Sequence, residues 1–229
     1  MGVQTVDTTE RTADRARAPG GEEIHPGEGL DFERIVFFSD AVFAIAITLL
    51  ALEIRLPIIA EPAALPAALA GLLPQIFTYV LSFLVVGLFW VGHHRIFRFI
   101  TGYNYQFVWL NVFFLLGVAF IPVPTQVVGQ YGDTPLGTIF YAGCLVVIGL
   151  LELLLWCYAA WGHRLVPADA SPRLLRFLGL RILVGPVVFA LSIPIALFNP
   201  YAAQASWALI VLGHAILRRR YPHEHQLRD

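Results

Sequence analysis

The sequence has little charge and no lysine. Charged residues make up 14% of the 229 residues, and all fifteen basic residues are arginine. The formal net charge is -1, so the chain lacks the basic field that holds phosphates, and nucleic acid is not an expected partner. Hydrophobic residues reach 58%, with a mean hydropathy of +0.70. One soluble globule cannot bury this excess, so the composition predicts an all-α polytopic protein in a lipid bilayer.

Cysteine is scarce, and several familiar motifs are missing. Cys144 and Cys157 share one apolar stretch, about 20 Å apart if it is helical, so they cannot form a disulfide within it. The chain contains no Gly-x-Ser-x-Gly, His-Glu-x-x-His or Gly-x-x-x-x-Gly-Lys motif, and it is expected not to be an enzyme and to need no cofactor. A Thr-Val-Gly-Tyr-Gly filter loop and a helix with regularly spaced arginines are also missing.

Six apolar stretches reach or approach the ~20 residues that a membrane helix needs. They cover residues 34–56, 65–97, 107–128, 136–161, 174–198 and 201–217. Asn199 and Pro200 separate the last two stretches and predict a tight hairpin, because one merged helix would exceed the thickness of a bilayer. The expected domains are a disordered N-terminal tail at 1–30, a six-helix transmembrane domain at 31–217 and a basic tail at 218–229.

Arginine placement predicts the orientation in the membrane. Fourteen arginines lie before the first span, after the sixth, or around the second and fourth connections, whereas the other three connections hold only Arg55. Under the positive-inside rule both termini are therefore cytoplasmic, which is consistent with an even number of helices in a multi-pass protein of the cell membrane.

Polar residues inside the spans require partners. Ser39 and Asp40 lie in the first span, and Trp90, His93 and Asn111 lie at a similar depth in the next two. An ionised carboxylate in hydrocarbon costs at least ~2.5 kcal/mol, so we expect Asp40 to reach another helix, where an indole or imidazole N–H is a suitable donor. The cluster either holds three helices together or carries protons, and the residues alone leave both interpretations open.

Two further features bear on function. Glu152 lies mid-span without a polar neighbour on its own helical face, and is either a functional carboxylate or a contact to another helix or subunit. The adjacent His93 and His94 point about 100° apart on a helix and cannot bind one ion together, so no metal site is expected.

The segment Arg34-Ile35-Val36-Phe37-Phe38-Ser39-Asp40 and the sequence FWVGHHRIF, which contains Trp90 and His93, occur in successive spans. Together they resemble the bacterial relatives of the lysosomal potassium channel transmembrane protein 175, over about residues 33–131. The Arg-x-x-x-Phe-Ser-Asp mark of that family is complete here.

The resemblance implies a homotetrameric, potassium-selective channel that conducts passively through a pore lined by the first helix of each subunit. It places hydrophobic constrictions at Ile45, Leu49 and Leu52, with Thr48 as a candidate polar ring beside them. It also implies one network of motif and inter-helix residues: Arg34, Phe38, Ser39, Asp40, Trp90, His93 and Asn111.

A coupled transporter is the competing interpretation. It would move protons or cations through a relay of Asp40, Glu152 and His93. Pro186 and Pro194 could break the fifth span as transporter helices are broken, but the sequence has no clear internal repeat. An intramembrane enzyme is disfavoured, because the chain lacks a nucleophile–base pair or a plausible metal set.

Overall fold

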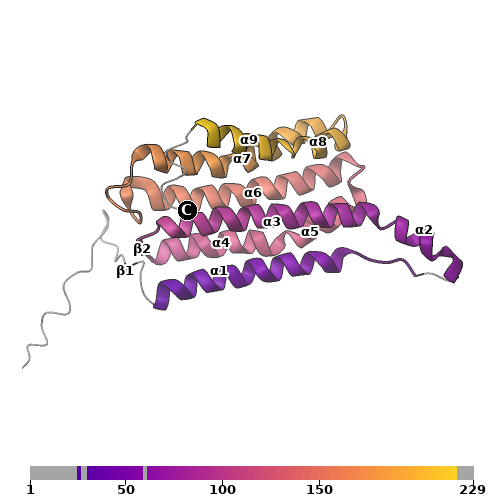
Figure 1. The fold of residues 1–229 in the computed structure, drawn as a ribbon, viewed down its shortest axis with the longest axis horizontal. Coiled ribbons are helices and arrows are strands. Elements are labelled where there is room, and N and C mark those ends of the chain that lie inside the picture. Colours follow the sequence, from indigo (N-terminus) through magenta and orange to yellow (C-terminus); the bar gives the residue numbers. More distant parts are fainter. Residues whose placement is uncertain (1–24, 27–29, 59–60, 221–229) are drawn as a thin grey trace, which may run out of the picture.

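The computed structural model describes residues 25–26, 30–58 and 61–220 as an elongated bundle of helices (Figure 1). The α-helices are α1 (Leu30–Leu49), α2 (Leu65–Ala70), α3 (Leu73–Phe99), α4 (Tyr105–Phe120), α5 (Pro122–Tyr131), α6 (Pro135–Ala160), α7 (Pro172–Ala196), α8 (Pro200–Ser206) and α9 (Leu209–Arg220). Short 3-10 helices are η1 (Leu50–Glu53), η2 (Pro62–Ala64) and η3 (Trp161–His163).

Within these described residues, six helical stretches are long and apolar enough to cross a membrane, which confirms the predicted number. They are Asp31–Glu53, Leu73–Phe99, Tyr105–Tyr131, Pro135–His163, Pro172–Ala196 and Pro200–Arg219. The predicted hairpin before the sixth stretch is present, and the Asn199 side chain caps α8 by accepting a hydrogen bond from the Ala202 backbone N–H at 3.0 Å. The chain is therefore a multi-pass membrane protein.

The second span begins later than the expected residue 65. Leu65–Ala70 forms the separate short helix α2, and α3 starts at Leu73 with Pro74 in its first turn. Proline lacks an N–H, and its ring clashes with the carbonyl four residues earlier, so Pro74 is favoured in the first turn of α3. A continuous helix over 65–97 would also be about 50 Å long, well beyond the ~30 Å hydrocarbon core. Proline does not always end a helix: α7 continues through Pro186 and Pro194, so the break of the fifth span that these prolines suggested is not present.

Two other spans are each built from two consecutive helices. The third divides between α4 and α5 at Ile121, where Pro122 opens α5 and Pro124 follows. The sixth divides between α8 and α9 around Trp207. Hydropathy alone does not reveal either division, because the residues on both sides remain apolar.

The helices pack in sequence across the bundle (Figure 1). Helix α6 lies in the middle and contacts α4, α5 and α7. Helix α1 lies at one edge and packs chiefly on α3 and α4, whereas α8 and α9 lie at the opposite edge against α7. One side of α1 is consequently left uncovered by the described part of its own chain.

Part of the expected N-terminal tail is paired. The strand β1 (His25–Pro26) forms an antiparallel pair with β2 (Gly102–Tyr103), with His25 opposite Tyr103. The rest of the tail predicted at 1–30 lies outside the described residues, apart from the start of α1 at Leu30, and most of the C-terminal tail predicted at 218–229 lies outside them as well. The prediction of disordered tails therefore stays a prediction for those segments.

The close approach of α6 and α7 depends on a glycine. A Cβ atom added at Gly149 would meet the buried Pro186 ring, whereas a Cβ at Gly143 on the same helix would meet nothing within 4 Å. We expect Gly149→Ala to lower the free energy of unfolding by about 1–3 kcal/mol, because a proline ring cannot rotate away. Unfolding in detergent measures this effect. Gly143→Ala serves as the matched control, and equal stability of the two variants would contradict this packing.

Candidate pore-lining helix and its polar cluster

Helix α1 and the adjoining η1 present two opposite faces. Ser39 and Phe43 are buried against α3 and α4, and Leu50 is buried in η1, which packs on α3 and α5; all three are 0–1% exposed. Ile45, Leu49 and Leu52 lie on the other side and are 59%, 40% and 68% exposed in the single chain. At about 100° per residue this i, i+4, i+7 set forms one stripe, which we call the aliphatic stripe. Its partner in the membrane is therefore lipid or another copy of the chain.

One hydrogen bond connects α1 to α3 through a carboxylate. The indole Nε1–H of Trp90 donates to Oδ1 of Asp40 at 2.9 Å. The imidazole ring of His94 stacks on Trp90 with ring centroids 5.7 Å apart. Asp40 is half-buried and faces away from the aliphatic stripe. The hydrogen bond from Trp90 therefore gives the carboxylate a partner within the protein, on the side of α1 away from the stripe.

A second chain of hydrogen bonds joins α1, α4 and α3 and is almost fully buried. The Asn111 side-chain amide donates to Oγ of Ser39 at 3.0 Å, and Ser39 donates to the Ile35 carbonyl at 2.9 Å. His93 Nε2 and Asn111 Oδ1 lie 2.9 Å apart, so the imidazole donates to the amide oxygen. Ser39, His93 and Asn111 are each at most 2% exposed.

Aromatic rings enclose His93. Its ring lies 4.3 Å from Phe97 and 5.6 Å from both Phe43 and Phe114, measured between centroids. Among the described residues, the imidazole therefore has one hydrogen bond, to Asn111, and several aromatic neighbours. This environment is suited to holding helices in register and is unlike the hydrated surroundings of a proton relay.

The structure does not bring every predicted network residue into the cluster. Arg34 is exposed and Phe38 is 55% exposed, and among the described residues neither makes a hydrogen bond or ring contact with the other members. Both lie at the same angular position as the aliphatic stripe, near the start of α1. Thr48 is exposed and donates its hydroxyl proton to the Ile45 carbonyl at 2.8 Å, which leaves only oxygen lone pairs available to an ion.

Glu152 lies on a different side of α3 from Asp40. It is 4% exposed, and a Cβ atom added at Gly92 would meet its carboxylate. Gly92 and Trp90 are about 200° apart around α3, so Glu152 and Asp40 approach that helix from nearly opposite directions. Asp40, Glu152 and His93 are therefore not joined by any hydrogen bond among the described residues.

A second buried polar cluster has no recognisable signature in the sequence. Ser82 on α3, Thr125 on α5 and Tyr141 on α6 are joined by two hydrogen bonds of 3.0 Å. The three residues are separated by up to 59 positions in the chain, and no motif marks them. In the described residues no group of three or more His, Cys, Asp or Glu side chains is arranged to hold a metal ion.

These features define a class of protein. A bundle of six membrane-crossing helices presents one edge helix, whose inner face is held by hydrogen bonds and whose outer face is aliphatic. The chain is thus a multi-pass membrane protein whose edge helix has an aliphatic face that the described part of the chain leaves uncovered.

Comparison with known proteins gives the family. The model of the family described as the endosomal/lysosomal potassium channel TMEM175 matches residues 34–122. A potassium channel of Chamaesiphon minutus is 36% identical over 69% of this chain and 83% of its own length. A potassium channel of Streptomyces collinus is 32% identical over 78% of this chain and 89% of its own length. This chain belongs to the TMEM175 family. The expectation that it is not an enzyme is confirmed by its membership of a family of ion channels.

A solved structure and an animal relative agree with this assignment. The crystal structure of a TMEM175 homologue from Chamaesiphon minutus, described as a lysosomal potassium-selective channel homologue, superposes with a TM-score of 0.71 at 27% identity, over 82% of this chain and 98% of that one. The human protein, named an endosomal/lysosomal proton channel, is 26% identical over 84% of this chain but only 39% of its own length.

The Trp90–Asp40 hydrogen bond predicts coupling between the two side chains. Asp40→Ala, Trp90→Phe and the double variant should show an interaction free energy of about 0.6–2 kcal/mol, because removing either partner removes the same bond. The free energy of unfolding in mixed detergent provides the measurement.

Trp109→Phe, combined with Asp40→Ala, is the control for this cycle. Trp109 is half-exposed on α4 and contacts Tyr105 and Phe113, so its effect should add to that of Asp40→Ala within about 0.5 kcal/mol. Additive behaviour of the Asp40 and Trp90 variants would show that their hydrogen bond contributes nothing.

Proposed function

We propose that this chain is the subunit of a potassium-selective channel in which the aliphatic stripe of four α1 helices lines one central pore. The observation that carries the proposal is the stripe itself. Ile45, Leu49 and Leu52 are exposed on the side of α1 opposite the hydrogen-bonded cluster. Membership of the TMEM175 family supports potassium as the permeant ion, which crosses passively and without a cofactor.

The gate in this proposal is hydrophobic. Four aliphatic side chains at one level form a ring that excludes water when it is narrow, and an ion cannot cross a dry constriction. Successive residues of the stripe are about 4.5–6 Å apart along the axis, so Ile45, Leu49 and Leu52 form three such rings in series. Widening of the rings readmits water and lets a cation pass.

Thr48 supplies the polar element next to these rings. Because its hydroxyl proton is used by the Ile45 carbonyl, its oxygen turns lone pairs outward from the helix. Lone pairs attract cations and repel anions, so four copies of Thr48 favour cation entry without replacing the hydration shell. Selectivity among alkali cations then depends on the width of the aliphatic rings.

The tetramer and its orientation belong to the same proposal. The first span occurs once in this chain, so a closed pore of such helices needs several copies, and cyclic symmetry brings equivalent stripes to one axis. Fourteen arginines at one end of the spans and Arg55 at the other favour cytoplasmic termini in the cell membrane.

The structure offers little support for a coupled transporter. Asp40 is occupied by Trp90, and His93 is bonded to Asn111 among aromatic rings. Glu152 approaches α3 from another direction. A direct relay needs groups within hydrogen-bond reach of one another, and in the described part of the chain no hydrogen bond joins any two of these three residues.

Polar substitution of the stripe should change ion preference. In liposomes that contain the purified protein, we expect potassium flux to exceed sodium flux, and Ile45→Asn to reduce this ratio several-fold because an amide wets the constriction. The human relative is named a proton channel. A proton gradient applied to the same liposomes therefore measures proton flux for comparison with potassium flux.

Leu150→Asn is the matched control, since Leu150 is 47% exposed on α6, away from the stripe. It should leave the flux ratio unchanged. Wild-type ratios in Ile45→Asn, Leu49→Asn and Leu52→Asn alike would remove the stripe from the conduction path.

Assembly around α1 predicts cross-linking between subunits. In a Cys144→Ala/Cys157→Ala background, Leu52→Cys should give disulfide-linked dimers under mild oxidation, because stripe residues of neighbouring subunits approach at the axis. Denaturing gels detect the product. Leu150→Cys should stay monomeric, and a dimer formed by Leu150→Cys alone would place the subunit interface elsewhere.

A further inference from the structure

A small polar pocket lies where η1 packs on α3 and α5. Its volume is about 130 Å³, and every residue that lines it except Gly129 has a polar side-chain group. The oxygens of interest belong to six of these residues: Glu53 on η1, Gln75 and Thr78 on α3, and Thr125, Gln126 and Gln130 on α5. One chain supplies the whole lining, so the pocket needs no second subunit to form.

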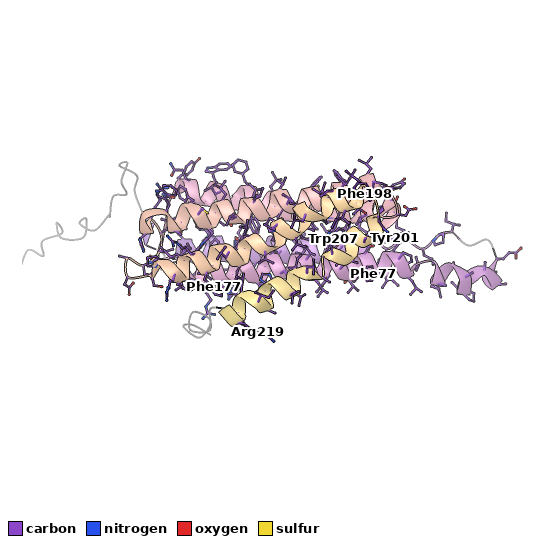
Figure 2. The ribbon with its side chains drawn as sticks, turned by 90° about the horizontal axis from the view of Figure 1, so that it is seen from above. Phe77, Phe177, Phe198, Tyr201, Trp207 and Arg219 are labelled. Carbon is purple, nitrogen blue, oxygen red and sulfur yellow. The ribbon has the colours of Figure 1, made fainter. Side chains whose placement is uncertain are left out.

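The pocket lies at the end of the bundle away from Arg219. Figure 2 shows Phe77, which falls between the lining residues Gln75 and Thr78 in the chain, toward the same end of the molecule as Phe198 and Tyr201. Phe177 and Arg219 lie toward the other end. Glu53 directly follows Leu52, the last residue of the aliphatic stripe, so the pocket adjoins the end of that stripe.

The Glu53 carboxylate has an oxygen that the protein leaves unsatisfied. Its Oε2 is buried and has no hydrogen-bond partner among the described residues. An ionised carboxylate can only accept hydrogen bonds or bind a cation. Burying a charged oxygen without a partner is unfavourable, so an occupant that carries positive charge is favoured beside it.

Two hydroxyl groups of the lining have already used their protons. Thr78 donates to the Pro74 carbonyl at 3.0 Å, and Thr125 donates to the Ile121 carbonyl at 2.9 Å. A hydroxyl has one proton, so each of these oxygens can offer only lone pairs to an occupant. With Glu53, oxygens that act as acceptors are therefore supplied by η1, α3 and α5 together, and hard cations bind such oxygens.

The charges of the lining favour a monovalent ion. Among the described residues that line the pocket, Glu53 is the one carboxylate and Arg55 the one guanidinium. Calcium affinity depends on the number of charged ligands, and a single carboxylate is too few for a tight divalent site. Arg55 is exposed, so water screens its charge, and its backbone N–H is bonded to Oε1 of Gln75 at 2.9 Å.

We propose that this pocket binds one alkali-metal cation, held by the Glu53 carboxylate together with hydroxyl and amide oxygens of α3 and α5. The pocket is large enough for the ion and some of its water. Water alone would leave the negative charge of Glu53 uncompensated, whereas the ion compensates it. By joining η1 to α3 and α5, the ion fixes the segment that follows the aliphatic stripe.

Thermal unfolding of the purified full-length chain in detergent measures the binding. The probes are the chlorides of potassium, sodium, calcium and N-methylglucamine at equal ionic strength, the last being a cation too large for the pocket. Potassium or sodium should raise the unfolding temperature by about 2 °C or more over N-methylglucamine, with a response that saturates. Calcium should raise it no further than potassium does.

Glu53→Gln tests whether this response comes from the pocket. The substitution keeps the shape of the side chain and removes its charge, so it should abolish most of the shift caused by potassium or sodium. Glu61→Gln is the matched control, because Glu61 is exposed, follows Glu53 in the same connection and does not line the pocket. This variant should keep the full shift.

Rubidium locates the ion in the unmodified protein, which removes any dependence on how well a variant folds. Anomalous diffraction from crystals grown in rubidium chloride should show a peak beside Glu53, between η1 and α5. The proposal is wrong if no peak lies there, if Glu53→Gln keeps the wild-type shift, or if calcium stabilises the chain more than potassium. Neither measurement uses ion flux, so each of these results is independent of whether the chain conducts potassium.

Discussion

The structure depends on the need to satisfy polar groups where no water is available. Ser39 and Asp40 cannot face hydrocarbon alone, and Asn111, His93 and Trp90 supply their partners from two neighbouring helices. Because these bonds determine which side of α1 faces inward, they also determine which side faces outward. The exposed position of Ile45, Leu49 and Leu52 is thus a consequence of hydrogen bonds on the opposite face.

Helix α3 connects the two polar regions of the molecule. It meets Asp40 through Trp90 and lies against Glu152 at Gly92, on nearly opposite sides. The first region has donors and acceptors matched within the protein. In the second, Oε1 of Glu152 and Nδ1 of His214 are buried and have no hydrogen-bond partner among the described residues.

Much of the fold could be predicted from the sequence, because hydrocarbon demands about twenty apolar residues per crossing. The division at Ile121 and the separation of α2 from α3 could not be predicted from the sequence. A proline in the first turn of a helix and a proline at a break between two helices leave the same hydropathy pattern. The partners of Ser39 and Asp40 were accessible through the family motif. The neighbours of Glu152 were not, because α6, α7 and α9 carry no diagnostic pattern and their meeting point is a property of packing.

The pairing of β1 with β2 has a mechanical consequence. The residues just before α1 are bonded to the turn between α3 and α4, and Phe32 at the start of α1 stacks on Phe97 and Tyr103. The start of α1 is therefore held against the turn between α3 and α4. A shift of α1 relative to the turn between α3 and α4 must therefore break these ring contacts.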